Sequence, residues 1–255
     1  MPITVKSPRE IELMTEAGRI LEIVHNELGK ALYPGMTTKE IDELGEEIIR
    51  SYDCIPSFLD YNGYPASICV SVNDEVVHGI PSPHRFIREG DIVSLDAGVI
   101  YKGYHSDAAR THGIGRISKE AEELIRVTRE CFFEGIKYAR EGNHLFDISA
   151  AIGRYAESRG FGVVRDLCGH GIGTALHEAP EIPNYEMNRK GVLLKAGMTL
   201  AIEPMINIGG WEVDWLDDDW TVVTRDHSLS AHYENTVLIT ENGPKLLSLT
   251  DTSGI

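Results

Sequence analysis

The sequence contains the stretch Arg88-Glu89-Gly90-Asp91-Ile92-Val93-Ser94-Leu95-Asp96, and its pattern returns in different letters as Lys195-Ala196-Gly197-Met198-Thr199-Leu200-Ala201-Ile202-Glu203. In both copies a basic residue and a glycine introduce a short apolar run that ends in a carboxylate, which an apolar strand would not ordinarily carry. At the same offset, residues 35–41 (GMTTKEI) align with residues 142–148 (GNHLFDI), and each opens a segment of helical spacing. We infer a duplicated half, folded about a pseudo-twofold axis that brings Asp96 and Glu203 to one central site.

Length and charge limit the classes of protein to which the chain can belong. Its 255 residues can bury a large core, and we expect a single domain over residues 1–255 with pseudo-symmetric halves at about 7–112 and 113–250. The net charge of -16 gives no general attraction to phosphate backbones or anionic lipid. Nucleic-acid binding through a basic face and attachment to a membrane surface are therefore disfavoured.

The cysteines indicate a reducing environment. They are widely separated and form no C-x-x-C pair, which excludes a zinc ribbon or a thioredoxin-type motif: Cys54, Cys69, Cys131 and Cys168. Two disulfides could form, but a domain of this length hardly needs them, so we expect reduced thiols. The N-terminus runs into charged helix without an apolar segment, and no run of 18 apolar residues occurs. We expect a soluble, cytoplasmic protein.

Helix signals precede strand signals twice along the chain. Ser7-Pro8-Arg9-Glu10 indicates a capping box with proline at the first helical position. The first half is expected to contain helices at 7–33 and 38–52 and strands at 66–72, 91–100 and 104–112, with a turn at 101–103. In the second half we expect a helix capped by Ser118, a helix at 144–158 and strands after it, including a strand-like run at 230–237. This order predicts an α+β fold with a largely antiparallel sheet. Residues 215–220 (WLDDDW) should form an exposed acidic connection before the final strand pair.

Acidic residues within apolar strands are the chemical signal of this sequence. Asp96 and Asp107 flank the expected turn symmetrically, so they should lie close to opposite one another on neighbouring strands, where like charges destabilise a sheet. Either one is protonated or a cation lies between them. Two solvated acids on an open face would be the plainer interpretation, but the apolar residues around Asp96 disfavour it. Glu203, which Pro204 follows, and Glu234 add two further acids on strand-like segments, and too few Lys or Arg residues lie there to pair them all.

A histidine adds a nitrogen ligand to this set. His170 lies among glycines in the stretch Gly169-His170-Gly171-Ile172-Gly173, and His78-Gly79-Ile80-Pro81 is a similar motif in the first half. A single histidine of this kind is as often structural as functional, but beside four buried acids it becomes a metal-ligand candidate. Four carboxylates and one neutral imidazole would balance two divalent cations, and an oxygen-rich set suits Mn, Fe(II) or Co better than structural zinc. Two such metals can hold a bridging hydroxide and polarise a carbonyl, so the residues alone indicate a dinuclear hydrolase.

At this point several motifs resemble a known family. They occur in its order over nearly the whole chain: Val77-His78-Gly79-Ile80-Pro81, Leu95-Asp96-Ala97-Gly98, His105-Ser106-Asp107-Ala108-Ala109-Arg110, Gly169-His170-Gly171-Ile172-Gly173, His177-Glu178, Ile202-Glu203-Pro204-Met205 and Tyr233-Glu234-Asn235-Thr236. This pattern is similar to type I methionine aminopeptidase, a bacterial-type metallopeptidase with the pita-bread fold. The resemblance implies removal of the N-terminal methionine from nascent proteins and peptides when the second residue is small, by attack of a metal-bridging hydroxide.

The resemblance also implies a role for individual residues. The ligands of two divalent ions, Fe(II), Mn(II) or Co(II) with zinc as a further candidate, would be Asp96, Asp107, His170, Glu203 and Glu234. His78 would donate a proton near the scissile nitrogen, His177 would face the carbonyl oxygen and Glu203 would act as acid and base. Together with His78 and His177, the methionine pocket would be lined by Phe58, Tyr61, Tyr64, Cys69, Leu176 and Trp220, although each of these alone could equally be core.

The chain departs from the bacterial pattern at a few positions. Asn235 stands where a histidine commonly follows the last ligand, Asp219 stands where a glycine precedes the pocket tryptophan, and residues 211–220 are acidic where a basic stretch is usual. None of these changes removes a ligand. The resemblance therefore does not predict the loop contacts near the substrate entrance.

Two other functions remain open from the sequence. A related pita-bread peptidase that cleaves before proline would share the five ligands, but such enzymes usually carry an additional N-terminal domain. A pita-bread protein that has lost catalysis and serves as a binding module would require a missing ligand, and none is missing. By the resemblance we expect a monomer that associates transiently with the ribosome, has no nucleic-acid specificity, and loses its own Met1 because Pro2 is small.

Overall fold

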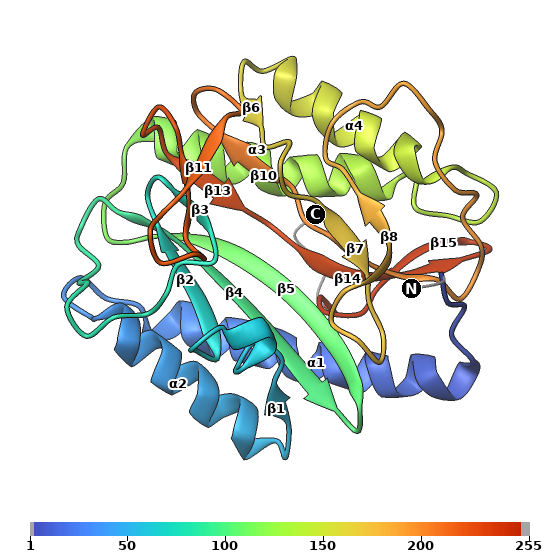
Figure 1. The fold of residues 1–255 in the computed structure, drawn as a ribbon, viewed down its shortest axis with the longest axis horizontal. Helices are drawn as coiled ribbons and strands as arrows, with labels where there is room; N and C mark the ends of the chain where they lie inside the picture. The colour runs from blue at the N-terminus through green and yellow to red at the C-terminus, as the bar shows by residue number, and fades with distance from the viewer. Residues whose placement is uncertain (1–2, 251–255) are drawn as a thin grey trace.

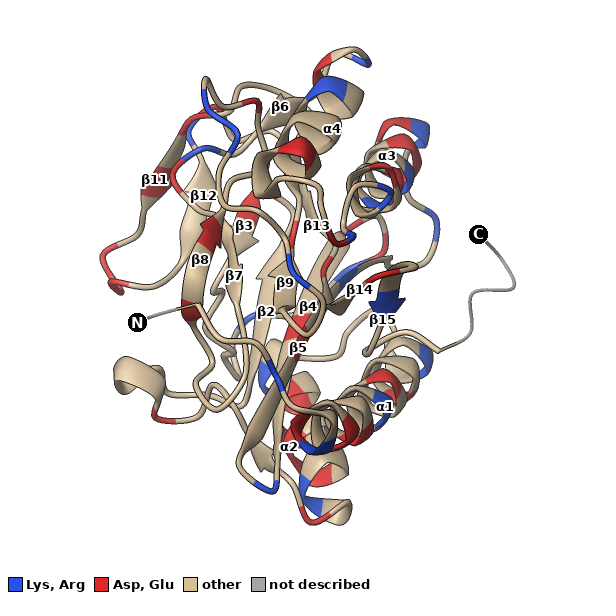
Figure 2. Cartoon of the chain, turned by 90° about the vertical axis from the view of Figure 1, so that its right-hand side faces the viewer, with Lys and Arg blue, Asp and Glu red and all other residues tan. Residues whose placement is uncertain are grey.

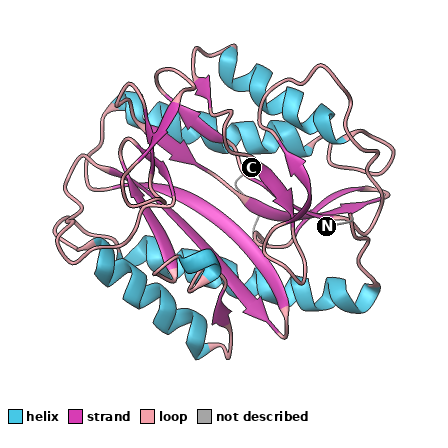
Figure 3. Ribbon diagram, in the orientation of Figure 1, coloured by secondary structure: helices cyan, strands magenta, loops and turns pink. Residues whose placement is uncertain are grey.

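The computed structural model describes residues 3–250 and forms a curved sheet region with helices on both sides (Figures 1 and 3). The helices are α1 (Pro8–Ala31), α2 (Thr38–Ser51), α3 (Lys119–Ile136) and α4 (Leu145–Glu157), with a 3-10 turn η1 (Tyr61–Gly63). The strands are β1 (Ile55–Pro56), β2 (Ile68–Val72), β3 (Glu75–Val77), β4 (Ile92–Tyr101), β5 (Tyr104–Gly113), β6 (Gly162–Val163), β7 (Gly169–Gly171), β8 (Glu178–Ile182), β9 (Thr199–Ile202), β10 (Met205–Asn207), β11 (Val213–Trp215), β12 (Val222–Thr224), β13 (Ser230–His232), β14 (Asn235–Thr240) and β15 (Gly243–Leu246). All observed strand pairs are antiparallel, so the predicted α+β class is confirmed.

Local capping signals determine where the helices begin. The Ser7 hydroxyl accepts the N–H of Glu10, and the Glu10 carboxylate accepts the N–H of Ser7, so the predicted capping box of α1 is present. Thr37 and Glu40 form the same box at α2, and Ser118 caps α3 through the N–H of Ala121. These contacts satisfy backbone groups that the first helical turn cannot pair internally. The predicted helices are confirmed to within a few residues at each end.

The repeat seen in the sequence has a physical counterpart in the backbone. Gly90 and Gly197 both adopt positive φ, 97° and 91°, just before β4 and β9, and each donates its N–H to a carbonyl of a neighbouring segment. Gly35 and Gly142 likewise have φ of 102° and 88° before α2 and α4. Because only glycine adopts these values without steric cost, the matched glycines mark equivalent turns. The pseudo-twofold repeat is confirmed, while its proposed boundary between residues 112 and 113 stays a prediction.

Two helix pairs cover the sheet region and enclose its apolar core. In Figure 1, α1 and α2 lie along one side of the strands and α3 and α4 along the other. The first pair packs on β2, β4 and β5, and the second pair encloses a core with the apolar residues of β9, β10, β13 and β14. Figure 2 shows that charged residues gather on the helices and loops, whereas most of the strand surface is uncharged. Within residues 3–250, no helix has both the length and the apolar character needed to cross a membrane.

The hairpin of β4 and β5 sets the relative positions of two acids. Its turn residues Lys102 and Gly103 both have positive φ, as a tight two-residue hairpin turn requires. The register pairs Asp96 with Ala109, and Gly98 with Asp107. The two acids are therefore diagonal neighbours on one face of adjacent strands, which confirms that they lie close to opposite one another.

Two parts of the second half differ from the sequence prediction. The run 230–237 is not one strand, because β13 ends at His232 and β14 begins at Asn235. The N–H of Tyr233 donates to the Pro204 carbonyl and the N–H of Glu234 donates to that of Ala109, so the chain changes partners there. Residues 215–219 are exposed, as expected, but Trp215 ends β11 and residues 216–219 lie in the connection to β12, in a hairpin that the sequence did not predict.

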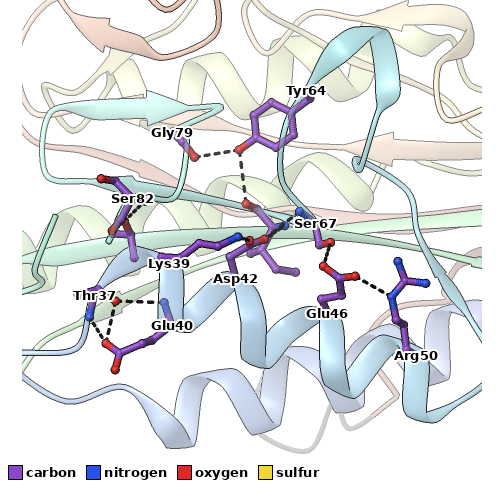
Figure 4. A network of polar contacts seen from close by, with 12 residues as sticks. Thr37, Lys39, Glu40, Asp42, Glu46, Arg50, Tyr64, Ser67, Gly79 and Ser82 are labelled. Carbon is purple, nitrogen blue, oxygen red and sulfur yellow. Dashed lines mark hydrogen bonds and ion pairs between the residues drawn. The ribbon is translucent and has the colours of Figure 1, made fainter. Parts of the chain in front are cut away.

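A buried carboxylate on α2 anchors the segment that leads into β2. Asp42 accepts the backbone N–H groups of Ser67 and Ile68 at 2.8 and 2.9 Å, and Lys39 donates to it at 2.7 Å (Figure 4). The hydroxyl of Tyr64 donates to the carbonyl of Gly79 at 2.9 Å in the same region. Helix α2 thereby holds the chain just after Tyr64.

We expect Asp42→Ala to lower the free energy of unfolding by about 2–4 kcal/mol, because two buried backbone N–H groups would lose their acceptor. Urea denaturation of the variant and the parent measures the difference. Glu12→Ala is the matched control, since its ion pair with Arg9 is exposed and contributes less than about 1 kcal/mol. Equal stability of the Asp42 variant and the control would contradict the anchoring role.

Candidate active site

Four acids and one histidine from separate strands meet at one cavity. Asp96 and Asp107 come from β4 and β5, and His170 comes from β7. Glu203 follows β9, and Glu234 lies in the break between β13 and β14. All five line a cavity of about 200 Å³, so the structure brings together every residue predicted as a metal ligand.

The distances within this cluster suit a shared ion better than direct hydrogen bonds. Ligand atoms of Asp107, His170 and Glu234 all lie within 4.8 Å of one another. The Nε2 atom of His170 is 3.6 Å from Glu203 Oε1 and 3.9 Å from Asp107 Oδ2. Its Nδ1 lies 2.9 Å from the Gly171 carbonyl, which can only accept, so Nδ1 carries the proton and the Nε2 lone pair faces the acids.

The acids have no cationic partner in the part of the chain that the structure describes. No Lys or Arg forms an ion pair with any of the four carboxylates, whose ion-pair contacts are with His170 and His232 alone, although the charge of Arg110 acts to lower the pKa of Glu234. Asp96 Oδ1, Asp107 Oδ1 and Glu234 Oε1 are buried without a hydrogen-bond partner. Such groups cost several kcal/mol unless a positive charge compensates them. The oxygen-rich donor set with one imidazole therefore fits divalent cations.

Burial controls the protonation of the cluster. It raises the pKa of Asp96 to about 7, with Glu203 adding to the effect. Burial and the neighbouring carboxylates raise the pKa of Asp107 and Glu234 well above the ordinary range, and burial does the same for Glu203. Burial lowers the pKa of His170 to about 3, which leaves a neutral imidazole suited to ligate a metal.

An apolar wall completes the same cavity. The remaining predicted side chains all line it: Phe58, Tyr61, Tyr64, Cys69, His78, Leu176, His177 and Trp220. The rings of Tyr64 and Trp220 meet edge to face at 5.1 Å, and the rings of His170 and His177 are 4.2 Å apart. Acidic and apolar side chains thus line the same small cavity, together with His78 and His177.

Backbone geometry positions the first of these histidines. His78 has φ of 60°, which is uncommon for a residue with a side chain. The next residue, Gly79, packs so closely on β2 that an added Cβ would lie 2.3 Å from the Val70 carbonyl oxygen. The Gly79 carbonyl accepts from both Val70 N–H and the Tyr64 hydroxyl, which fixes this turn. Burial lowers the pKa of His78 to about 4, so the ring is neutral.

A buried ion pair supports the loop of the second histidine. Lys6 Nζ lies 2.7 Å from Glu178 Oε2, and both side chains are about 5% exposed. The Thr4 hydroxyl donates to the same carboxylate at 2.7 Å. On the cavity side, the Tyr61 hydroxyl lies 2.7 Å from Nδ1 of His177. The side chain of His177 and the residue after it are therefore held by different parts of the chain.

Sequence reasoning missed two residues at this site. Asn62 lines the cavity beside Tyr61. His232 is buried, its Nε2 lies 3.6 Å from Glu203 Oε2, and neither ring nitrogen has a hydrogen-bond partner among the described residues. The signal for His232 was its place two residues before Glu234, since alternate residues of an extended chain share one face.

The sequence profile of Metallopeptidase family M24 matches residues 12–241. The chain belongs to this family. This M24 member is 55% identical over 247 residues to methionine aminopeptidase of Clostridium acetobutylicum, which covers 97% of this chain and 99% of the relative. The crystal structure of methionine aminopeptidase from Thermotoga maritima superposes with a TM-score of 0.95 at 46% identity, over 98% of this chain and 100% of that one. The predicted resemblance and the pita-bread fold are confirmed.

A more distant M24 structure bears on the alternative peptidase. Prolidase from Pyrococcus furiosus has a TM-score of 0.76 and 24% identity, and the match covers 97% of this chain but 66% of the prolidase. At this identity the likeness extends to the fold alone. The likeness to methionine aminopeptidases is much closer in both sequence and length.

As the pH rises, the free energy of unfolding of the metal-free protein should fall relative to that of the Asp96→Asn variant. A carboxyl group whose pKa is raised in the folded state favours folding below its unfolded pKa of about 4, and this contribution is lost as the pH rises through about 7. Urea midpoints in chelator between pH 4 and 8 measure the effect. A divalent cation should abolish it, because it stabilises the ionised carboxylate. Parallel curves for the parent and the variant would contradict the role of Asp96.

Lys6→Met should lower the free energy of unfolding by about 3–5 kcal/mol, because Glu178 would remain buried without its partner. We expect kcat/KM to fall as the His177 loop shifts. The double variant Lys6→Met, Glu178→Met should recover most of the stability, because two apolar side chains replace the pair. The exposed pair of Arg225 and Asp214 supplies the control Arg225→Met, which should change stability by less than about 1 kcal/mol. A loss of stability in Lys6→Met no larger than in this control would contradict the role of the ion pair in supporting the His177 loop.

Proposed function

We propose that the protein is a metal-dependent aminopeptidase that removes the N-terminal methionine from nascent proteins and peptides with a small second residue. The observation that carries the proposal is one cavity in which a cluster of uncompensated acids adjoins an apolar wall. The cavity has the size for one side chain, about 200 Å³, and is too small for an internal stretch of polypeptide. The preference for a small second residue rests on the family resemblance.

The metal ligands in this proposal are Asp96, Asp107, His170, Glu203 and Glu234, which would hold two divalent ions. The donor set favours Fe(II), Mn(II) or Co(II), and zinc is the remaining candidate. When bound, such ions polarise the scissile carbonyl and activate water as a nucleophile. By the family resemblance, Glu203 would also act as acid and base, moving a proton between the attacking water and the leaving amine.

The two histidines act as neutral hydrogen-bond donors. Burial lowers the pKa of both rings, so each carries a single N–H at neutral pH. When Nδ1 of His177 accepts from Tyr61, the proton resides on Nε2, which donates to the carbonyl oxygen as negative charge develops there. His78 donates near the scissile nitrogen.

The apolar wall recognises the methionine side chain. Its aromatic rings and the sulfur of Cys69 suit an unbranched, polarisable thioether. Burial raises the pKa of the Cys69 thiol well above its usual value, so it serves as an apolar contact and not as a nucleophile.

The cellular setting follows from the substrate. We propose a cytoplasmic monomer that meets nascent chains during transient ribosome association. Free Cys54, Cys69, Cys131 and Cys168 are consistent with a reducing compartment. Removal of the protein's own methionine stays a prediction, since Met1 and Pro2 lie outside the described residues.

Metal-stripped protein should release methionine from Met-Gly and Met-Ala peptides when Mn(II) or Co(II) is added, and should leave Met-Leu and Ala-Pro peptides intact. Quantified amino-acid release measures this selectivity. Asp107→Asn should weaken metal binding in calorimetry together with activity, because it removes one charged ligand. Cleavage of the Ala-Pro peptides would transfer the protein to the Xaa-Pro peptidases, and absence of cleavage with every metal would favour a non-catalytic binding module.

A further inference from the structure

A second, larger cavity opens beside the active site. It is a groove of about 800 Å³ that shares His170 and His177 with the small cavity. One side consists of residues 178–181, which directly follow His177, and the floor includes residues 168–170. A chain whose first residue occupies the small cavity would meet this groove next to the scissile bond.

The groove runs along an unpaired sheet edge. The five-stranded sheet has the order β15-β14-β9-β7-β8, so β8 is its terminal strand. Among the described residues, β7 is the only strand paired with β8, and four of the five β8 residues line the groove. An open edge of this kind can accept an extended peptide as an additional strand. Pro180 can offer only its carbonyl there, which limits pairing to part of the edge.

The opposite wall is largely apolar with charges at its rim. Leu145 and Phe146 at the start of α4 and the exposed Val192 supply the apolar surface. Arg189 is exposed on this wall, with its guanidinium 5.3 Å from the Phe146 ring centre, and Glu181 is exposed on the β8 side. An apolar wall opposite free backbone groups suits a peptide of varied sequence, because main-chain hydrogen bonds do not depend on which side chains the peptide carries.

We propose that this groove binds the substrate polypeptide beyond its second residue, as an extended strand laid parallel to β8. The proposal rests on the proposed function, which places the substrate N-terminus beside His177. Strand β8 begins next to His177 and passes His170, which pairs with Glu181, so both chains would run along the edge of the active site in the same direction. At about 3.3 Å per residue, the four β8 residues that line the groove match three or four residues of substrate. The bound segment would therefore end at about the fifth or sixth residue.

Peptide length provides the first test. In the series Met-Ala-NH2, Met-Ala-Ser-NH2 and longer amides, kcat/KM should rise by about tenfold or more and level off at five or six residues. N-methylation should lower kcat/KM at one of positions 3 and 4 but not at both, because adjacent N–H groups of an extended chain point to opposite sides. A flat length series, or equal effects of methylation at both positions, would overturn the proposal.

A substitution in the wall provides the second test. Val192→Asp should abolish the gain with length and leave cleavage of Met-Ala-NH2 unchanged, because it places a charge on the apolar wall outside the small cavity. Phe86→Asp, at another exposed apolar position away from both cavities, should retain the gain. If Val192→Asp lowered kcat/KM equally for Met-Ala-NH2 and for long peptides, the proposal would be overturned.

The same experiment separates this proposal from the proposed function. Failure of the parent to cleave any peptide in the series, Met-Ala-NH2 included, would overturn the proposed function and the groove with it. Cleavage of Met-Ala-NH2 without a gain in longer peptides would overturn the groove alone. A gain that varies with protein concentration would overturn it as well, because the edge of β8 would then pair with a second copy of the chain.

Discussion

Mutual repulsion among buried carboxylates is the constraint on which the rest of the structure depends. The fold encloses four acids at one point, and the described part of the chain offers no Lys or Arg to neutralise them. Taking each ionised group out of water costs several kcal/mol, so the cluster works against folding until a cation is present. The stability that offsets this cost has to come from elsewhere, and the two apolar cores beneath the helix pairs supply it.

The acids occupy positions where regular strand pairing is interrupted or where small residues leave room. Asp96 and Asp107 face Ala109 and Gly98 across the hairpin, so no bulky side chain separates them. Glu203 stands between the end of β9 and Pro204, and Glu234 stands where the chain changes from one sheet to another. An uninterrupted strand would direct successive acids to fixed, alternating faces. The interruptions allow side chains from several strands to converge on one volume.

The sequence predicted those parts of the structure that local chemistry controls. The capping box at Ser7 and the acids inside apolar runs depend on near neighbours, and both were found as expected. The break at residues 233–234 was missed, because the run alternates like one strand and only Pro204 and Ala109, distant in sequence, create the break. The pairing of Lys6 with Glu178 could not be predicted from the sequence for the same reason, since it joins residues 172 positions apart.

The departure at Asn235 illustrates how a ligand can keep its support when a neighbour changes. The side-chain oxygen of Asn235 accepts from Arg110 at 2.6 Å and from the Ser248 hydroxyl at 3.0 Å. Arg110 is buried and also donates to the carbonyls of Ala109 and Glu234, so its guanidinium holds the backbone on which the Glu234 carboxylate is mounted. An amide oxygen has two lone pairs and can satisfy both donors, whereas a neutral imidazole has one acceptor nitrogen. Asparagine therefore suits a chain with arginine at position 110, although its own Nδ2 is buried without a hydrogen-bond partner among the described residues.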